Sequence, residues 1–174
     1  ETVEDFYRQK FNNLEPELAD YLYVNKITPT WLKKKLNNRF VNPFYEVRPI
    51  SADLDFLDQL SSLRQLFSKA KMQWQENRAS IIKLLNSPTL NKKSYKVASI
   101  SSLVSDLDLY FAQSYPSLKI STRFVLVTNT KIESSTNKGQ SLIEHELFMI
   151  CDEFMKEAVS IKDSFENYLN SQLV

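Results

Sequence analysis

Apolar residues recur at intervals of three and four along most of the chain, the spacing that places side chains on one face of an α-helix. The first such segment predicts a helix over residues 3–13, preceded by Thr2 and Asp5 in the arrangement of a capping box. Pro16 suits the first turn of a second short helix, which we expect to end before Asn25 and Lys26.

A third helix is predicted by the segment TPTWLKKKLNNRF, with Thr28 as its N-cap and Pro29 in its first turn. It is followed by NPFYEVRPI, residues 42–50, which contains two prolines. Because proline lacks a backbone N–H and disfavours helix in the residue before it, we expect this segment to be an extended linker within the domain.

The longest pattern predicts one continuous helix over residues 52–86, with Ser51 as its N-cap. Its apolar positions alternate steps of four and three, as in the heptad seam of a coiled coil. Asn77 is the polar exception, either a solvated or hydrogen-bonded position or a residue that sets the register. A second apolar stripe widens this face, so we favour a helical bundle over an isolated coiled coil. The seam consists of Phe56, Leu60, Leu63, Phe67, Ala70, Trp74, Asn77, Ile81 and Leu84.

The final helix is predicted over residues 141–172, with Ser141 and Glu144 as a second capping box just after the only glycine, Gly139. One apolar stripe runs along it, and we expect this stripe to face the core. Its members are Ile143, Leu147, Ile150, Phe154, Ala158, Ile161, Phe165 and Tyr168.

Between the two long helices, residues 97–111 predict a further amphipathic helix. The pattern over residues 118–132 is ambiguous. Alternating apolar residues there favour a short strand or hairpin, and we expect one, although Ile120, Phe124 and Val127 also have helical spacing.

The predicted fold class is therefore mainly α, an elongated helical bundle with two long helices (about 52–86 and 141–172) and several shorter ones. Elongation follows because the first long helix spans about 54 Å, whereas a compact globule of this chain length has a radius of gyration of about 16 Å. The length of 174 residues predicts a single domain over residues 1–174. Because the chain begins with Glu1 rather than methionine, we expect a fragment of a longer protein.

Composition excludes several classes of function. The chain has 1 glycine among its 174 residues, whereas glycine makes up about 7% of an average protein. The phosphate-binding loops of nucleotide enzymes need several glycines, so the sequence argues against these enzymes. A formal net charge of +1 gives no global attraction to nucleic acid or anionic membranes. No apolar run approaches the length of a membrane span. A single cysteine excludes an internal disulfide, so we expect an intracellular protein, cytoplasmic or nuclear.

The only histidine, His145, and the only cysteine, Cys151, both lie in the predicted final helix. A zinc-protease helix reads His-Glu-x-x-His, but here the second histidine position is Met149. His145 and Cys151 are six residues apart, so within one helix they point in different directions and cannot pair as base and nucleophile. We expect no catalytic residue, no metal site and no cofactor, and interpret both residues as packing residues.

Two surfaces are candidate binding sites. On the final helix, four residues lie off the main stripe and make its first half apolar nearly all round. Either another part of the chain covers this side or a partner protein binds it, and internal cover is the more common case. We call these residues the 142–149 patch: Leu142, His145, Phe148 and Met149.

The second candidate is a basic patch on the third helix, where cationic residues lie beside aromatic ones. Such a combination suits nucleic-acid strands. However, a run of three lysines is more often a solvated helix face, and the acidic final helix offers an internal counter-charge. The basic patch consists of Lys26, Trp31, Lys33, Lys34, Lys35 and Arg39.

From these observations we expect a non-enzymatic interaction domain, which uses helix faces to bind other protein subunits as a scaffold, tether or adaptor. The alternative is a nucleic-acid-binding module that uses the basic helix over residues 28–39.

Overall fold

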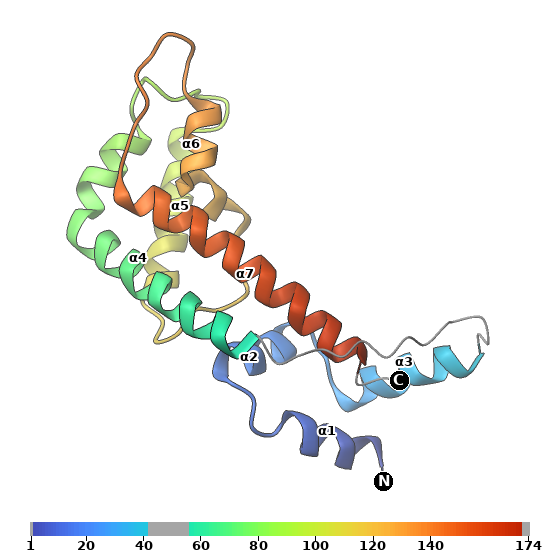
Figure 1. Ribbon diagram of the computed structural model, residues 1–174. Coiled ribbons are helices and arrows are strands. Elements are labelled where there is room, and N and C mark those ends of the chain that lie inside the picture. Colours follow the sequence, from blue (N-terminus) through green and yellow to red (C-terminus); the bar gives the residue numbers. More distant parts are fainter. Residues whose placement is uncertain (1, 42–55, 172–174) are drawn as a thin grey trace. The chain divides into compact units, whose positions relative to one another are not determined.

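The computed structural model describes residues 2–41 and 56–171, and it is mainly helical, as the sequence predicts (Figure 1). The two long helices are confirmed, α4 with 30 residues and α7 with 26. The elements in chain order are α1 (Val3–Phe11), α2 (Pro16–Val24), α3 (Pro29–Val41), α4 (Phe56–Leu85), α5 (Val97–Phe111), the 3₁₀ helix η1 (Thr122–Val127), α6 (Asn129–Ser135) and α7 (Glu146–Ser171).

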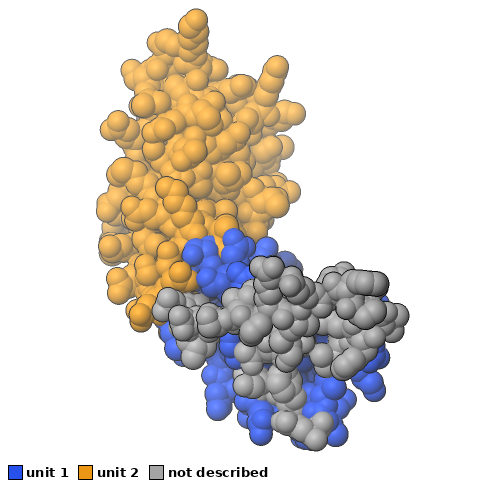
Figure 2. Space-filling view, turned by 45° about the vertical axis from the view of Figure 1, so that its right-hand side comes forward, with its two compact units in different colours: residues 1–57, 117–119, 160–174 blue, residues 58–116, 120–159 orange. Residues whose placement is uncertain are grey.

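The chain forms two compact units, coloured blue and orange in Figure 2. Unit 1 comprises residues 1–57, 117–119 and 160–174, and unit 2 comprises residues 58–116 and 120–159. Unit 1 therefore contains α1, α2, α3 and the C-terminal part of α7. Unit 2 contains nearly all of α4, together with α5, η1, α6 and the first part of α7. The single-domain expectation is not tested by this division and stays a prediction.

The predicted starts of the first three helices are confirmed. The Thr2 hydroxyl accepts the Asp5 N–H at 3.2 Å, and the Asp5 carboxylate accepts the Thr2 N–H at 3.3 Å, which completes the capping box. Pro16 opens α2. The Thr28 hydroxyl accepts the Trp31 N–H at 3.2 Å and so caps α3. Local side-chain chemistry is enough to place these boundaries.

The predicted seam of α4 is buried along most of its length, whereas Leu84 is half-buried and its neighbour Leu85, from the second apolar stripe, is fully buried. Asn77 donates to the Gln73 side chain at 3.0 Å within the same helix, which supports the hydrogen-bonded interpretation over the register-setting one. The Ser51 cap and the 42–50 linker lie outside the described residues. The buried seam residues are Leu60, Leu63, Phe67, Ala70, Trp74 and Ile81.

Aromatic rings form the centre of unit 2. The Phe67 and Tyr110 rings meet edge to face with centroids 5.7 Å apart, and the Phe124 and Phe154 centroids are 5.8 Å apart. Phe111 joins both pairs through Phe67 and Phe124. These residues come from α4, α5, η1 and α7, so one cluster of rings connects four elements. Such contacts add to the stabilisation from burial alone.

The expected strand or hairpin near 118–132 is wrong: no strand occurs among the described residues, and this segment forms η1 and α6. The Ser121 and Thr128 hydroxyls each accept a backbone N–H from the turn that follows and so start these two helices. Phe124 and Val127 are buried. Because a 3₁₀ helix has about three residues per turn, this spacing places both side chains on one side of η1.

The start of α7 also differs from the prediction. Residues 141–145 are not helical, and the Ser141 capping box is wrong. His145 takes its place, because its Nδ1 accepts the Leu147 N–H at 3.1 Å while its carbonyl accepts the Phe148 N–H at 3.0 Å. An imidazole nitrogen thus satisfies an N–H that the first turn of a helix leaves without a partner.

Candidate functional site

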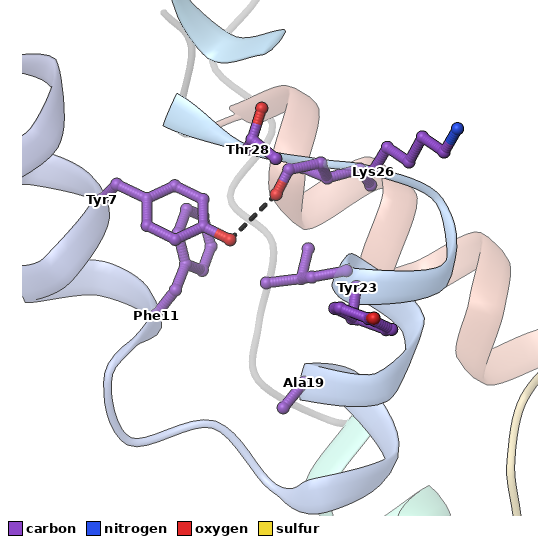
Figure 3. A pocket seen from close by; sticks show the side chains of 8 residues that line it. Tyr7, Phe11, Ala19, Tyr23, Lys26 and Thr28 are labelled. Atoms are coloured by element: carbon purple, nitrogen blue, oxygen red, sulfur yellow. Dashed lines mark hydrogen bonds between the residues drawn. The ribbon is translucent and has the colours of Figure 1, made fainter. Parts of the chain in front are cut away.

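Unit 1 contains a pocket of about 570 Å³ between α1, α2 and the turn that joins α2 to α3 (Figure 3). This volume is typical of ligand pockets, which range over about 300–1,000 Å³. Aromatic and aliphatic side chains make up most of its wall, and the only charged residue among those that line it is Lys26. We call it the unit 1 pocket. Its lining consists of Tyr7, Phe11, Ala19, Leu22, Tyr23, Lys26, Ile27 and Thr28.

The turn after α2 is a Schellman motif. The Lys26 N–H donates to the Tyr23 carbonyl at 3.1 Å, and the Ile27 N–H donates to the Leu22 carbonyl at 2.9 Å. Lys26 has a φ of 54°, a left-handed conformation in which glycine is usual. No other non-glycine residue in the described part of the chain has a positive φ. Leu22 and Ile27, which this backbone hydrogen bond joins, are both buried and both line the pocket.

The opposite wall belongs to α1. Figure 3 shows the Tyr7 ring reaching across to the turn, where its hydroxyl donates to the Ile27 carbonyl at 2.8 Å. The Tyr7 and Phe11 ring centroids are 4.9 Å apart. Burial raises the pKa of Tyr7, so the hydroxyl is a protonated donor at neutral pH. This hydrogen bond therefore joins α1 to the turn between α2 and α3.

Tyr23 stands at the rim of the unit 1 pocket with 85% of its surface exposed. The adjacent wall residue one turn earlier, Ala19, is also exposed. Residue spacing does not predict this pocket, and the one signal of it in the sequence is Tyr23, an aromatic residue off the apolar stripe of its own helix. Tyr7 and Ile27 are 20 positions apart, so no local spacing indicates that they meet.

Ile27 also lines a second pocket of unit 1, of about 290 Å³. Here the Tyr21 hydroxyl donates to the Glu166 carboxylate. Burial is the main cause that raises the pKa of Tyr21, and the Glu166 carboxylate raises it further. The Lys35 ammonium lies 5.3 Å from the centre of the Trp31 ring, a cation–π contact. The lining residues are Tyr21, Asn25, Ile27, Trp31, Lys35, Glu166 and Leu169.

The described members of the basic patch lie on α3 and on the turn before it. Its four lysines are exposed, and Trp31 is half-buried. Among the described residues, no carboxylate forms an ion pair with these lysines. The Arg39 side chain lies outside the described part. Nucleic-acid binding by this surface, and its pairing with acids of the final helix, stay predictions.

The residues of the 142–149 patch differ in their exposure to solvent. Phe148, which lies off the main stripe, is fully buried, so at this residue the protein itself covers the patch. The buried face of α7 is wider than one stripe, because Phe148 and Cys151 are buried together with the stripe residues. Leu142 and Met149 are 54% and 55% exposed. His145 is half-buried, with its ring centroid 5.5 Å from that of Phe148. Partner binding through the exposed residues stays a prediction.

His145 and Cys151 have separate surroundings. Burial lowers the pKa of His145, while the neighbouring Glu146 acts in the opposite direction. Burial raises the pKa of the Cys151 thiol, which keeps it protonated and poorly nucleophilic. Among the residues that the structure describes, no group of three or more His, Cys, Asp and Glu side chains is arranged to hold a metal ion. The observed role of His145 is to cap α7.

None of the helices within residues 2–41 and 56–171 is long and apolar enough to cross a membrane. No protein-family model matches the chain. A search of curated protein sequences likewise finds no match.

Proposed function

We propose that the chain is a non-enzymatic protein-interaction domain that serves as a scaffold, tether or adaptor subunit of a multi-protein assembly. The main support is the unit 1 pocket, an apolar hollow with Tyr23 exposed on its rim. Aromatic residues beside apolar pockets are the usual anchors of protein interfaces, because they bury a large surface when a partner binds. The partners in this proposal are other protein subunits.

The proposed compartment is intracellular. Its support is the single cysteine, which is a free thiol at Cys151. Proteins of oxidising compartments commonly stabilise helical domains with disulfides, and reducing compartments maintain thiols in this form.

A photo-crosslinking experiment tests the proposal. Tyr23 is replaced by a benzophenone amino acid in the full chain, which is then irradiated in an extract of its source cells. Leu109, which is 71% exposed and belongs to α5 of unit 2, is the matched control position. We expect discrete protein adducts from position 23 that position 109 does not form.

Adducts that are absent at position 23, or identical at both positions, contradict the proposal. Identical adducts would show that exposure alone, rather than this pocket, decides what the chain contacts. Absent adducts would show that no partner lies at the pocket.

A second candidate function is nucleic-acid binding through the basic patch. Residues 26–41 contain five basic residues and no acidic one, and the lysines of this segment are exposed. Phosphate contacts weaken steeply as salt rises, because binding releases counterions. The test is binding of labelled single- and double-stranded DNA and RNA at low salt. No detectable binding by the parent chain removes this candidate.

A further inference from the structure

We propose that the unit 1 pocket binds one bulky apolar side chain from an acidic segment of a partner protein, with Lys26 and the lysines of α3 binding the carboxylates that flank it. This inference rests on the proposed function and adds the chemistry of the partner. It is carried by the apolar pocket, the conformation of Lys26 and the local excess of positive charge.

The pocket suits an apolar anchor. Its lining includes the apolar side chains of Leu22 and Ile27, at the two ends of a backbone hydrogen bond of the Schellman turn, and the Tyr7 and Phe11 rings on α1. The Tyr7 hydroxyl already donates its proton to a backbone carbonyl, so it has no donor left for a ligand in the pocket. Tyr23 is free to close over a bound side chain because most of its surface is exposed.

Lys26 is a strained residue at the edge of this pocket. Its left-handed backbone favours glycine, and a non-glycine residue there destabilises the fold. Strained backbone positions cluster at functional sites such as ligand clamps. Figure 3 shows the Lys26 side chain extending outward from the turn, with its ammonium group beyond the pocket wall. An ammonium in that place can meet a carboxylate beside the anchor.

Further positive charge lies on α3, the helix that follows the pocket turn. Thr28 lines the pocket, and Lys35 follows it by seven positions on α3, about 10 Å along the helix axis. An extended peptide advances about 3.3 Å per residue, so an acid three residues from the anchor spans this distance. Residues 26–41 carry no acidic side chain that would compete. The Glu166 carboxylate near Lys35 already accepts the Tyr21 hydroxyl.

These features favour a protein segment over a nucleic acid. Bases bind most often by stacking on exposed aromatic faces. The Trp31 ring, the aromatic residue of the basic patch, is half-buried and already has the Lys35 ammonium over its face. The unit 1 pocket is instead a concave apolar site, which phosphates and sugars do not fill.

The test begins with a library of short random peptides displayed on phage and selected on the full chain. We expect the enriched peptides to share one Phe, Trp, Leu or Met flanked by Asp or Glu. A representative peptide is then synthesised with a fluorescent label, together with one version whose apolar residue is Ser and one whose acids are amides. Each change should weaken binding about tenfold or more.

Variants of the chain locate the site. Ala19→Trp fills the pocket from an exposed position of α2 and should abolish peptide binding, whereas Ala79→Trp, at an exposed position of α4, should not change it. Tyr23→Ala should weaken binding about tenfold. Circular dichroism confirms that each variant is folded.

Lys26→Gly separates binding from structure. Glycine relieves the left-handed strain, so the variant should have a higher Tm than the parent while binding the acidic peptide several-fold more weakly. A purely structural role for Lys26 predicts no loss of binding.

Charge reversal tests the helix lysines. Changing Lys33, Lys34 and Lys35 together to Glu should remove most of the peptide affinity and its salt dependence, with the fold intact because exposed helix charges contribute little to stability. The matched control reverses the same total charge in unit 2, at the exposed Lys69, Lys83 and Lys93.

The inference is overturned if no acidic apolar motif is enriched, or if Ala19→Trp binds the peptide as the parent does. Should crosslinks at position 23 persist in that case, the proposed function survives and only this ligand chemistry fails. If both experiments are negative, both proposals fail. Oligonucleotide binding that the α3 charge reversal abolishes, without any selected peptide, replaces this proposal with the nucleic-acid candidate.

Discussion

At the residue scale, the only histidine of the chain is a helix cap. Its Nδ1 accepts the Leu147 N–H, so the neutral ring carries its proton on Nε2. Aspartate, asparagine and serine are the usual residues for this role, and histidine fills it here with a ring that also contacts Phe148. In the structure, His145 therefore begins α7, and its ring packs beside Phe148.

Substitution of His145 tests this role. His145→Ala should lower the free energy of unfolding by about 0.5–2 kcal/mol, because the Leu147 N–H loses its partner, whereas His145→Asn should retain most of the stability. Urea denaturation measures both. Equal losses in the two variants would contradict the capping role.

The same residue predicts a pH dependence. The pKa of His145 is lowered from its ordinary value of 6.5 in the folded state. As the pH falls below 6.5, His145 therefore binds a proton more readily in the unfolded chain than in the folded one. The contribution of His145 is fully present above that value and declines as the pH falls towards its folded pKa. The stability advantage of the parent over His145→Asn should therefore shrink on acidification, as measured by urea midpoints across this window.

Two neighbouring residues of α7 give a matched test of burial. Phe148→Asp should unfold or severely destabilise the domain, because it places an unpaired carboxylate at a fully buried position. Met149→Asp should change the free energy of unfolding by less than about 0.5 kcal/mol, since that side chain is half exposed. Thermal melts that rank the two variants in the opposite order would contradict the observed burial.

At the element scale, one carboxylate joins α4 to α5 inside unit 2. Asp108 accepts the Trp74 indole N–H at 3.0 Å and two N–H groups of Arg78 at 2.9 and 2.8 Å. The Arg78 guanidinium also lies 5.7 Å from the Trp74 ring centre. These hydrogen bonds, with Arg78 first, lower the pKa of Asp108. Trp74 is buried, so its N–H depends on this partner.

We expect Asp108→Ala to lower the free energy of unfolding by about 1–3 kcal/mol, because it leaves a buried indole N–H without an acceptor. Arg78→Met should cost less than about 1 kcal/mol, since the ion pair is largely exposed and the indole hydrogen bond survives.

Because the Asp108 pKa is lowered on folding, its contribution is present above about pH 4 and is lost as the pH falls through the folded value. Denaturant midpoints at neutral and acidic pH check both statements.

At the scale of the whole molecule, the two tryptophans report on different units. Trp31 lies in unit 1 and Trp74 in unit 2. The helix α7 supplies Phe154 to the core of unit 2 and Phe165 to that of unit 1, both of them buried. Because a continuous helix forms cooperatively, loss of one end weakens the other.

We therefore expect the two units to unfold together, as the single-domain prediction requires. Trp31→Phe leaves Trp74 as the fluorescent reporter of unit 2, and Trp74→Phe leaves Trp31 as the reporter of unit 1. The denaturant midpoints of the two variants should coincide after correction for the stability change that each substitution causes. Two separate transitions would instead show that the units are independent domains.

Small-angle scattering can test the elongated form that the sequence predicts. We expect a radius of gyration clearly above the value of about 16 Å for a compact globule of this length. A value at or below that figure contradicts the expectation.

The sequence by itself determined the helices and several of their boundaries. Apolar periodicity and side-chain caps are local properties, and so residues such as Thr2 and Thr28 could be assigned without knowing what packs against them. Periodicity also identified most of the buried stripe of α4. It misjudged residues 118–132, because the same apolar residues fit a strand and a 3₁₀ helix.

Only the tertiary structure decided which of these helix faces meet, and therefore which residues form a site. The unit 1 pocket depends on Tyr7 reaching Ile27 and on the left-handed turn at Lys26, neither of which has a signature in residue spacing. Phe148 is likewise buried because α7 has a buried face wider than one stripe. Burial depends on contacts between segments distant in the chain, whereas periodicity records only the side of its own helix on which a residue lies.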